Sequence, residues 1–265
     1  METNSKQKKI IQLVMEYVKS GGRVLEVRCG DGKVLGQLQK AGDIVRGTNY
    51  SKYPNAIQAV EIDSCVNINE GLPYEDASFD CVILCDVIEH FPNHIQAIRE
   101  VSGVVRAGGH TIILTPNTMK IGSRLHFLFT GFFKIKQAFI GFDVPADMAF
   151  VFHNNPPHLP VFLYHLHSHY LETVKVYGAN YKFKSIIFWL AFAPVIVPYK
   201  FFKTFVSKRN LKYEGASSLL FHTLTSFEVL CAEYWISVNK KVDPSLHPRQ
   251  LKTKLPAWVQ KSIKE

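Results

Sequence analysis

The fold of this chain is decided by the stretch Arg23-Val24-Leu25-Glu26-Val27-Arg28-Cys29-Gly30-Asp31-Gly32. Its apolar, partly β-branched start predicts a buried strand of a parallel sheet. Gly30 and Gly32 predict a tight turn in which the backbone can approach a ligand. The following residues, 33–40, have apolar side chains at helical spacing. A strand, a glycine turn and a helix in this order are typical of a nucleotide-binding α/β unit, whose helix points its amides at the ligand. Arg28 stands where such turns usually have their first glycine.

Strand and helix patterns continue to alternate along the chain, which predicts a parallel sheet covered by helices on both faces. Further strands are expected at residues 44–48, 62–68, 79–85, 110–115 and 232–239, with a possible strand at 181–188. Helices are expected at residues 10–19, 55–60, 92–105, 159–177 and 219–230.

Composition supports one large folded domain inside a reducing compartment. The 265 residues are 47% hydrophobic, enough for a sizeable core. The five cysteines include no Cys-x-x-Cys pair, so a structural zinc site is not expected. No apolar segment follows the polar N-terminus, so we expect no secretory signal and a cytoplasmic protein. The net charge of +9 favours either an anionic partner or a solvated basic tail.

Two segments depart from the alternation. Residues 118–160 are rich in Phe and Gly without a clear period, and we expect a lid or acceptor-binding insertion. Residues 186–212 are first apolar and then basic, too short and too interrupted by prolines for a membrane span. They suit a helix at the boundary of lipid headgroups, placing the protein peripherally at an anionic membrane. A surface helix that packs its aromatic rings on the sheet is the alternative. We therefore expect one domain over residues 1–240 and a basic tail over 241–265.

Five segments in order resemble the class I S-adenosylmethionine (SAM)-dependent methyltransferases, most closely the branch called methyltransferase type 11. They are Val24 to Gly32, Asn67 to Tyr74, Ser78 to Val82, Asp86 to Phe91, and Arg106 to Gly109 followed by Thr115-Pro116-Asn117. A looser likeness, at Ser123-Arg124-Leu125 and nearby residues, is to methyltransferases that modify polysaccharides and lipids.

The resemblance implies a Rossmann-like, seven-stranded sheet, mostly parallel with the last strand antiparallel. It also implies SAM as cofactor, bound at the carboxyl ends of the strands. The residues that match the cofactor-binding positions are Glu26, Arg28, Cys29, Gly30, Gly32, Asn49, Asn67, Ile68, Cys85, Asp86 and Val87.

Three of these positions depart from the family pattern. Asn49 and Asn67 stand where acids usually accept hydrogen bonds from the ribose and the adenine, and an amide loses the charge-assisted part of each bond. Arg28 either fills the pocket or pairs with the carboxylate of the cofactor.

Methyl transfer is an in-line displacement, so the protein supplies alignment and excludes water, and a base helps if the acceptor is a hydroxyl. The candidate bases are His90 and His158, and more remotely His153. Asn117 could orient the acceptor, and Arg124 could hold an anionic group on it. No metal site is expected, because His165, His167 and His169 lie on two faces of one predicted helix.

The leading hypothesis is therefore methyl transfer to a hydroxyl or related group of a small molecule, glycan, lipid-linked sugar or lipid. The alternative, prompted by Arg28, Asn49 and Asn67, is a catalytically impaired methyltransferase-like binding or scaffold protein. A nucleic-acid substrate is disfavoured, because no Asn-Pro-Pro-Tyr type motif follows the fourth strand and aromatics interleave with basic residues only near residues 200–213.

Overall fold

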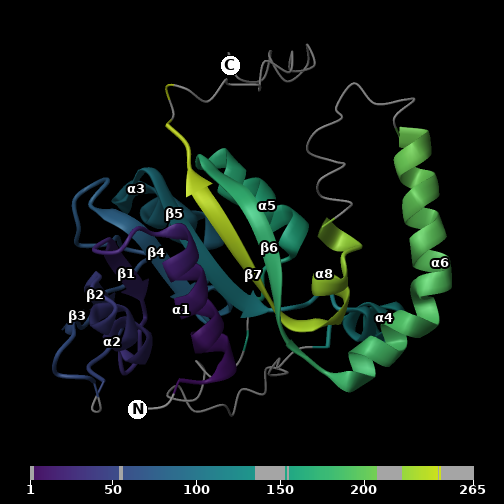
Figure 1. The fold of residues 1–265 in the computed structure, drawn as a ribbon, viewed down its shortest axis with the longest axis horizontal. Coiled ribbons are helices and arrows are strands. Elements are labelled where there is room, and N and C mark those ends of the chain that lie inside the picture. Colours follow the sequence, from purple (N-terminus) through teal and green to yellow (C-terminus); the bar gives the residue numbers. More distant parts are fainter. Residues whose placement is uncertain are drawn as a thin grey trace.

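One seven-stranded sheet with the order β3-β2-β1-β4-β5-β7-β6 forms the centre of the computed structural model (Figure 1). The structure describes residues 3–53, 56–134, 153, 155–207, 223–243 and 245. The strands are β1 (Arg23–Val27), β2 (Ile44–Thr48), β3 (Glu61–Asp63), β4 (Phe79–Cys85), β5 (Val105–Pro116), β6 (Leu171–Tyr181) and β7 (Ala232–Lys241). Strand β7 runs antiparallel to both of its neighbours, and the other described pairings are parallel. This confirms the predicted sheet.

Helices flank the sheet on both faces. They are α1 (Ser5–Tyr17), α2 (Lys33–Lys40), the short 3-10 helix η1 (Ile88–His90), α3 (His94–Val104), α4 (Ile121–Thr130), α5 (Leu159–Ser168), α6 (Phe183–Ser207) and α8 (Phe227–Cys231). Helices α1 and α2 pack on one face and share a core with Cys81 and Ile83 of β4. Helices α3 and α5 pack on the other face, against Val82 and Leu84. The alternation along β4 follows from the two-residue period of a strand buried on both sides.

Gly47 of β2 fixes how closely the glycine turn packs on the sheet. It lies opposite Glu26 in the β1–β2 pairing. A Cβ atom at Gly47 would lie 2.5 Å from Cys29 Sγ and 2.9 Å from Leu35 Cδ1. Only a residue without a side chain therefore lets the turn after β1 and helix α2 sit against β2.

Replacing Gly47 with alanine is expected to lower the free energy of unfolding by about 1–3 kcal/mol, because Cys29 and Leu35 must move to admit the methyl group. Urea denaturation measures the difference. Gly122→Ala is the matched control, since a Cβ there meets no atom within 4 Å and alanine favours a helix. Equal stability of the two variants would contradict this account of the packing.

Several predicted element boundaries are wrong. The strand expected at 62–68 is the three-residue β3, and the described part of 55–60 forms a turn. The helix expected at 159–177 ends at Ser168, where Tyr170 turns with a φ of 63° and the chain enters β6. Pairing with β7 makes the second half of this segment a strand, although its apolar spacing is also compatible with a helix. Residues 183–188, considered as part of a strand, begin α6.

Helix α6 lies along one side of the molecule, next to α4 and α8 (Figure 1). It is 25 residues long and contains Pro194 and Pro198, the usual cause of a change in helix direction. No helix within the described residues is apolar over a sufficient length to cross a membrane. The alternative that residues 186–212 pack their aromatic rings on the sheet is wrong for Phe202, which is 64% exposed. Residues 135–152 and 154 of the predicted insertion, and most of the basic tail, lie outside the described residues.

Candidate active site

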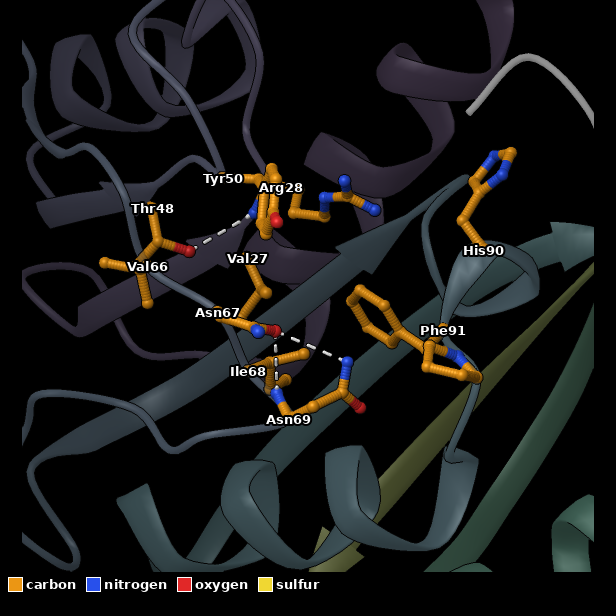
Figure 2. Close-up of a pocket in the computed structure, with 11 residues that line it drawn as sticks. Val27, Arg28, Thr48, Tyr50, Val66, Asn67, Ile68, Asn69, His90 and Phe91 are labelled. Atoms are coloured by element: carbon orange, nitrogen blue, oxygen red, sulfur yellow. Dashed lines mark hydrogen bonds between the residues drawn. The ribbon is translucent and has the colours of Figure 1, made fainter. Parts of the chain in front are cut away.

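A cavity of about 300 Å³ opens at the carboxyl ends of β1 and β2, opposite η1 (Figure 2). Its lining residues are Val27, Arg28, Thr48, Tyr50, Val66, Asn67, Ile68, Asn69, His90, Phe91 and Pro92. This edge is where ligands bind in open α/β sheets. The volume is at the lower end of the range for small-molecule sites.

Arg28 reaches from the end of β1 across this cavity toward η1 (Figure 2). Its backbone is left-handed, with a φ of 55°, and its N–H donates to Thr48 Oγ1 at 3.3 Å. The guanidinium carbon lies 5.6 Å from the ring centres of both Tyr50 and Phe91. Burial lowers the pKa of Arg28, and no carboxylate among the described residues pairs with it. Because a partly buried cation without a counter-ion is unfavourable, the cavity is suited to an anionic group.

The glycine turn is held by Asn49. Its Oδ1 accepts from Gly30 N at 2.9 Å, and its Nδ2 donates to Gly30 O at 2.8 Å. Gly30 and Gly32 both have positive φ, and a Cβ at Gly30 would meet nothing within 4 Å. The turn therefore leaves open space beside Gly30. Asn49 fixes the turn in place of the expected contact with a ribose.

Glu26 is the second unusual charge near the turn. Its side chain is 4% exposed, and its Oε2 has no hydrogen-bond partner within the described chain. Burial, aided by Asp31, raises the pKa of Glu26 to about 8. Glu26 does not border the cavity itself but lies two residues before Arg28 on β1. An orphaned, buried carboxyl oxygen is satisfied by a donor such as a ligand amino group.

The other residues expected to hold the cofactor divide into two groups. Asn67 and Ile68 border the cavity, and Asn67 accepts from Asn69 N at 3.2 Å. Cys85, Asp86 and Val87 lie outside its lining. Asp86 forms an ion pair with Lys6 of α1, and Val87 belongs to the core. Cys29 follows Arg28 in the turn, and burial raises the pKa of its thiol.

Glu89, His90 and His153 meet at the side of the cavity that η1 forms. The ring centres of His90 and His153 lie 5.2 Å apart. Glu89 is fully buried, with Thr115 Oγ1 donating to its Oε2 at 2.9 Å. Burial raises the pKa of Glu89 to about 7. His90 thus has a buried carboxyl beside it.

The residues expected to bind the acceptor hold backbone instead. Asn117 is 1% exposed, and its amide donates to Val229 O and Ala232 O while accepting from Met119 N. The Arg124 guanidinium donates to Met119 O and Leu224 O. These contacts give both residues a structural role, as a correction to their expected place in acceptor binding. His158 precedes α5 near Arg124, and burial together with that cation lowers the His158 pKa.

Sequence reasoning missed Thr48, Tyr50 and Phe91 as residues that line the cavity. Tyr50 follows the end of β2 and Phe91 follows η1. Their positions shortly after β2 and β4 were the available signal, because the carboxyl ends of parallel strands meet at one edge of the sheet.

Comparison with known proteins agrees with this geometry. A family model described as a methyltransferase domain matches residues 25–113. Methyltransferase GfsG of Streptomyces halstedii is 32% identical over 106 residues, which cover 36% of this chain and 38% of that protein. A ubiquinone biosynthesis O-methyltransferase of Vibrio vulnificus is 28% identical over 119 residues, covering 40% and 51%. The matches thus span about half or less of these relatives.

A solved structure extends the likeness to the whole sheet. The S-adenosylmethionine-dependent methyltransferase from Mesorhizobium loti superposes with a TM-score of 0.54 at 11% identity, covering 89% of this chain and 98% of that chain. At this identity the likeness concerns the fold. The matched domain and the strand order show that this chain has a methyltransferase domain with the fold of the class I SAM-dependent methyltransferases. The matched domain and these neighbours imply S-adenosylmethionine as the cofactor.

Proposed function

We propose that this protein transfers a methyl group from SAM to an oxygen of a lipid, a lipid-linked glycan or another amphiphilic acceptor. The observation that carries the proposal is a pair of side chains at one turn: Glu26, whose buried Oε2 has no hydrogen-bond partner among the described residues, and Arg28, which pairs with no described carboxylate. SAM carries an ammonium and a carboxylate on the same carbon atom, so its methionine end can satisfy both residues.

The chain would then use five side chains in the reaction. Glu26 holds the amino group of the cofactor and Arg28 holds its carboxylate, while Tyr50 and Phe91 exclude water around that ion pair. SAM supplies an electrophilic methyl group that needs no covalent nucleophile. His90 borders the same cavity and accepts the proton of an acceptor hydroxyl.

The choice of oxygen and of an amphiphilic acceptor rests on two observations. The Vibrio vulnificus relative is named as an O-methyltransferase. Helices α4 and α6, which follow β5 and β6, expose large apolar side chains. These are Phe127, Leu128 and Phe129 on α4 and Phe183, Ile187, Leu190, Val195 and Phe202 on α6. So large an apolar surface is typical of a site for a membrane or another apolar partner.

Methyl-labelled SAM tests the proposal directly. We expect the purified chain to transfer label to material that partitions into organic solvent from a total lipid extract, and His90→Ala to lower that transfer by about 100-fold. Label transfer into the aqueous fraction alone would contradict the amphiphilic acceptor. Tight SAM binding without any transfer would favour the alternative of a binding protein.

We also propose that α4 and α6 dock on an anionic membrane. A cavity of about 590 Å³ between the two helices combines apolar residues with four lysines, Lys120, Lys134, Lys182 and Lys184. Apolar side chains beside several cations suit the boundary between lipid tails and anionic headgroups. Lys120 and Lys182 both pair with Glu233, at 2.7 and 2.9 Å, which holds them at the mouth of this cavity.

Co-sedimentation with lipid vesicles tests the docking surface. The vesicles contain phosphatidylcholine, either alone or with about one third of the anionic lipid phosphatidylglycerol. The double variant Leu128→Asp/Phe129→Asp is expected to lose most of its vesicle binding, because two charges enter the apolar surface. Met15→Asp on α1 is the control, since Met15 is also exposed, at 55%. Equal binding of both variants, with circular dichroism confirming that they are folded, would overturn this proposal.

A further inference from the structure

Glu89, His90 and His153 form a cluster whose composition and geometry suit a function other than proton transfer. One donor atom of each residue lies within 4.8 Å of the other two. Glu89 Oε1 lies 3.9 Å from His153 Nε2. Metal–ligand bonds of about 2.0–2.2 Å place two ligands of one ion about 3–4 Å apart, so small side-chain rotations bring these donors into a coordination shell.

Glu89 provides an independent sign of a binding site. The side chain is fully buried, and its Oε1 has no hydrogen-bond partner among the residues that the structure describes. A buried carboxyl oxygen without a partner costs free energy, and this one faces two imidazoles. A cation between the three side chains would satisfy it.

Hydrogen bonds around the cluster hold its members in place, as the hydrogen-bond partners of metal ligands commonly do. Thr115 donates to the other carboxyl oxygen of Glu89. Asn155, two residues after His153, donates its backbone N–H to Glu89 O and its side-chain amide to Phe91 O, each at 3.0 Å. These bonds tie the segment that carries His153 to η1.

We propose that Glu89, His90 and His153 bind one divalent transition-metal ion at the edge of the cofactor cavity. Two imidazoles and one carboxylate form the ligand set of open zinc sites and of facial two-histidine, one-carboxylate sites. Imidazole ligands favour such ions over Mg²⁺ or Ca²⁺. This site could not be expected from the sequence, because His153 lies more than sixty residues from Glu89 and His90 along the chain.

The position of the ion suggests a role in binding the acceptor. This role rests on the proposed methyl transfer. His90 borders the cavity, so an open coordination position would face the approaching acceptor. A hydroxyl bound to such an ion would lose its proton more readily, and the proton would pass to water, because His90 would then hold the ion instead of acting as the base. The acceptor class thereby narrows to compounds with a hydroxyl beside a second oxygen, which can bind the ion through both.

Titration of the untagged, chelator-treated full chain with Co²⁺ tests the site by its visible absorption, and calorimetry with Zn²⁺ and Mg²⁺ measures stoichiometry. We expect one Zn²⁺ per chain, a cobalt spectrum of low symmetry, and much weaker Mg²⁺ binding. His153→Ala and Glu89→Gln should each weaken Zn²⁺ binding by about 100-fold. His165→Gln, on α5, is the control and should change nothing.

The absence of stoichiometric Zn²⁺ or Co²⁺ binding by the folded parent would overturn the metal site, as would equal binding by the control and the His153 variant. The same samples titrated with SAM separate the two proposals. SAM binding without metal binding refutes the metal site alone. Metal binding without SAM binding refutes the proposed methyl transfer.

Discussion

Glu26→Gln is expected to weaken SAM binding by about 30-fold, which corresponds to about 2 kcal/mol for a charge-assisted hydrogen bond. Glu26 is buried, and its Oε2 lacks a partner in the described part of the chain. The amide keeps the shape of the side chain but not the charge that pairs with the cofactor ammonium. Calorimetric titration with SAM measures the loss.

The ligand 5′-methylthioadenosine serves as the matched control, because it lacks the amino-acid part of the cofactor. Its affinity should be the same for the parent and for Glu26→Gln. If the substitution weakens both ligands equally, Glu26 supports the pocket as a whole and does not bind the methionine end.

The same residue also makes stability depend on pH. The pKa of Glu26 is raised from 4.5 to about 8 in the folded chain. Folded Glu26 therefore keeps its proton where the unfolded chain loses it, and the free energy of unfolding falls as the pH rises from about 4.5 to about 8. Urea denaturation at pH 5 and pH 8.5 should show a gain of stability for Glu26→Gln over the parent that is larger at the higher pH. A gain that does not depend on pH would contradict the raised pKa.

Arg28→Ala is expected to weaken SAM binding by about 30-fold or more, because it removes the cation that pairs with the carboxylate of the cofactor. Arg28→Lys should retain part of the affinity, since an ammonium keeps the charge without the planar fork of donors. Binding of 5′-methylthioadenosine should not fall in either variant. Calorimetric titration of the three proteins with both ligands provides the comparison.

Arg28→Gly distinguishes the two possible roles of this side chain. If Arg28 filled the cavity and blocked it, the glycine variant would bind SAM where the parent does not, and the binding-protein alternative would hold. In our account Arg28→Gly loses affinity as Arg28→Ala does. It should nevertheless be about 1 kcal/mol more stable than the alanine variant, because the φ of 55° is strained for any residue with a Cβ.

Much of this fold could be predicted because its central strands are buried on both faces. Runs such as Phe79–Cys85 are apolar except for Asp80, and they end at glycines or polar turns that are visible in the sequence. The predicted boundaries are wrong where pairing with a strand remote in the chain determines the structure. Leu171–Tyr181 has an apolar spacing compatible with a helix, and only its long antiparallel contact with β7 makes it a strand.

Residues that line the cavity could be predicted in part from the sequence, but the hydrogen-bond partners of the polar residues near it could not. Arg28 and Asn67 were expected at the pocket and lie there. Asn49 and Asn117 were expected to touch ligands, but each binds backbone through both ends of its amide. Sequence position places a polar residue near a site, whereas its hydrogen-bond partners come from segments that are remote in the chain.

The central claim is that the turn after β1 binds the methionine end of SAM through Glu26 and Arg28. Titration calorimetry of the full chain with SAM at pH 7, in two buffers of different ionisation enthalpy, tests it most directly. We predict one SAM per chain and a heat that depends on the buffer, because the cofactor ammonium drives a proton from Glu26. A folded sample that binds no SAM, or binds it with the same heat in both buffers, would contradict the account.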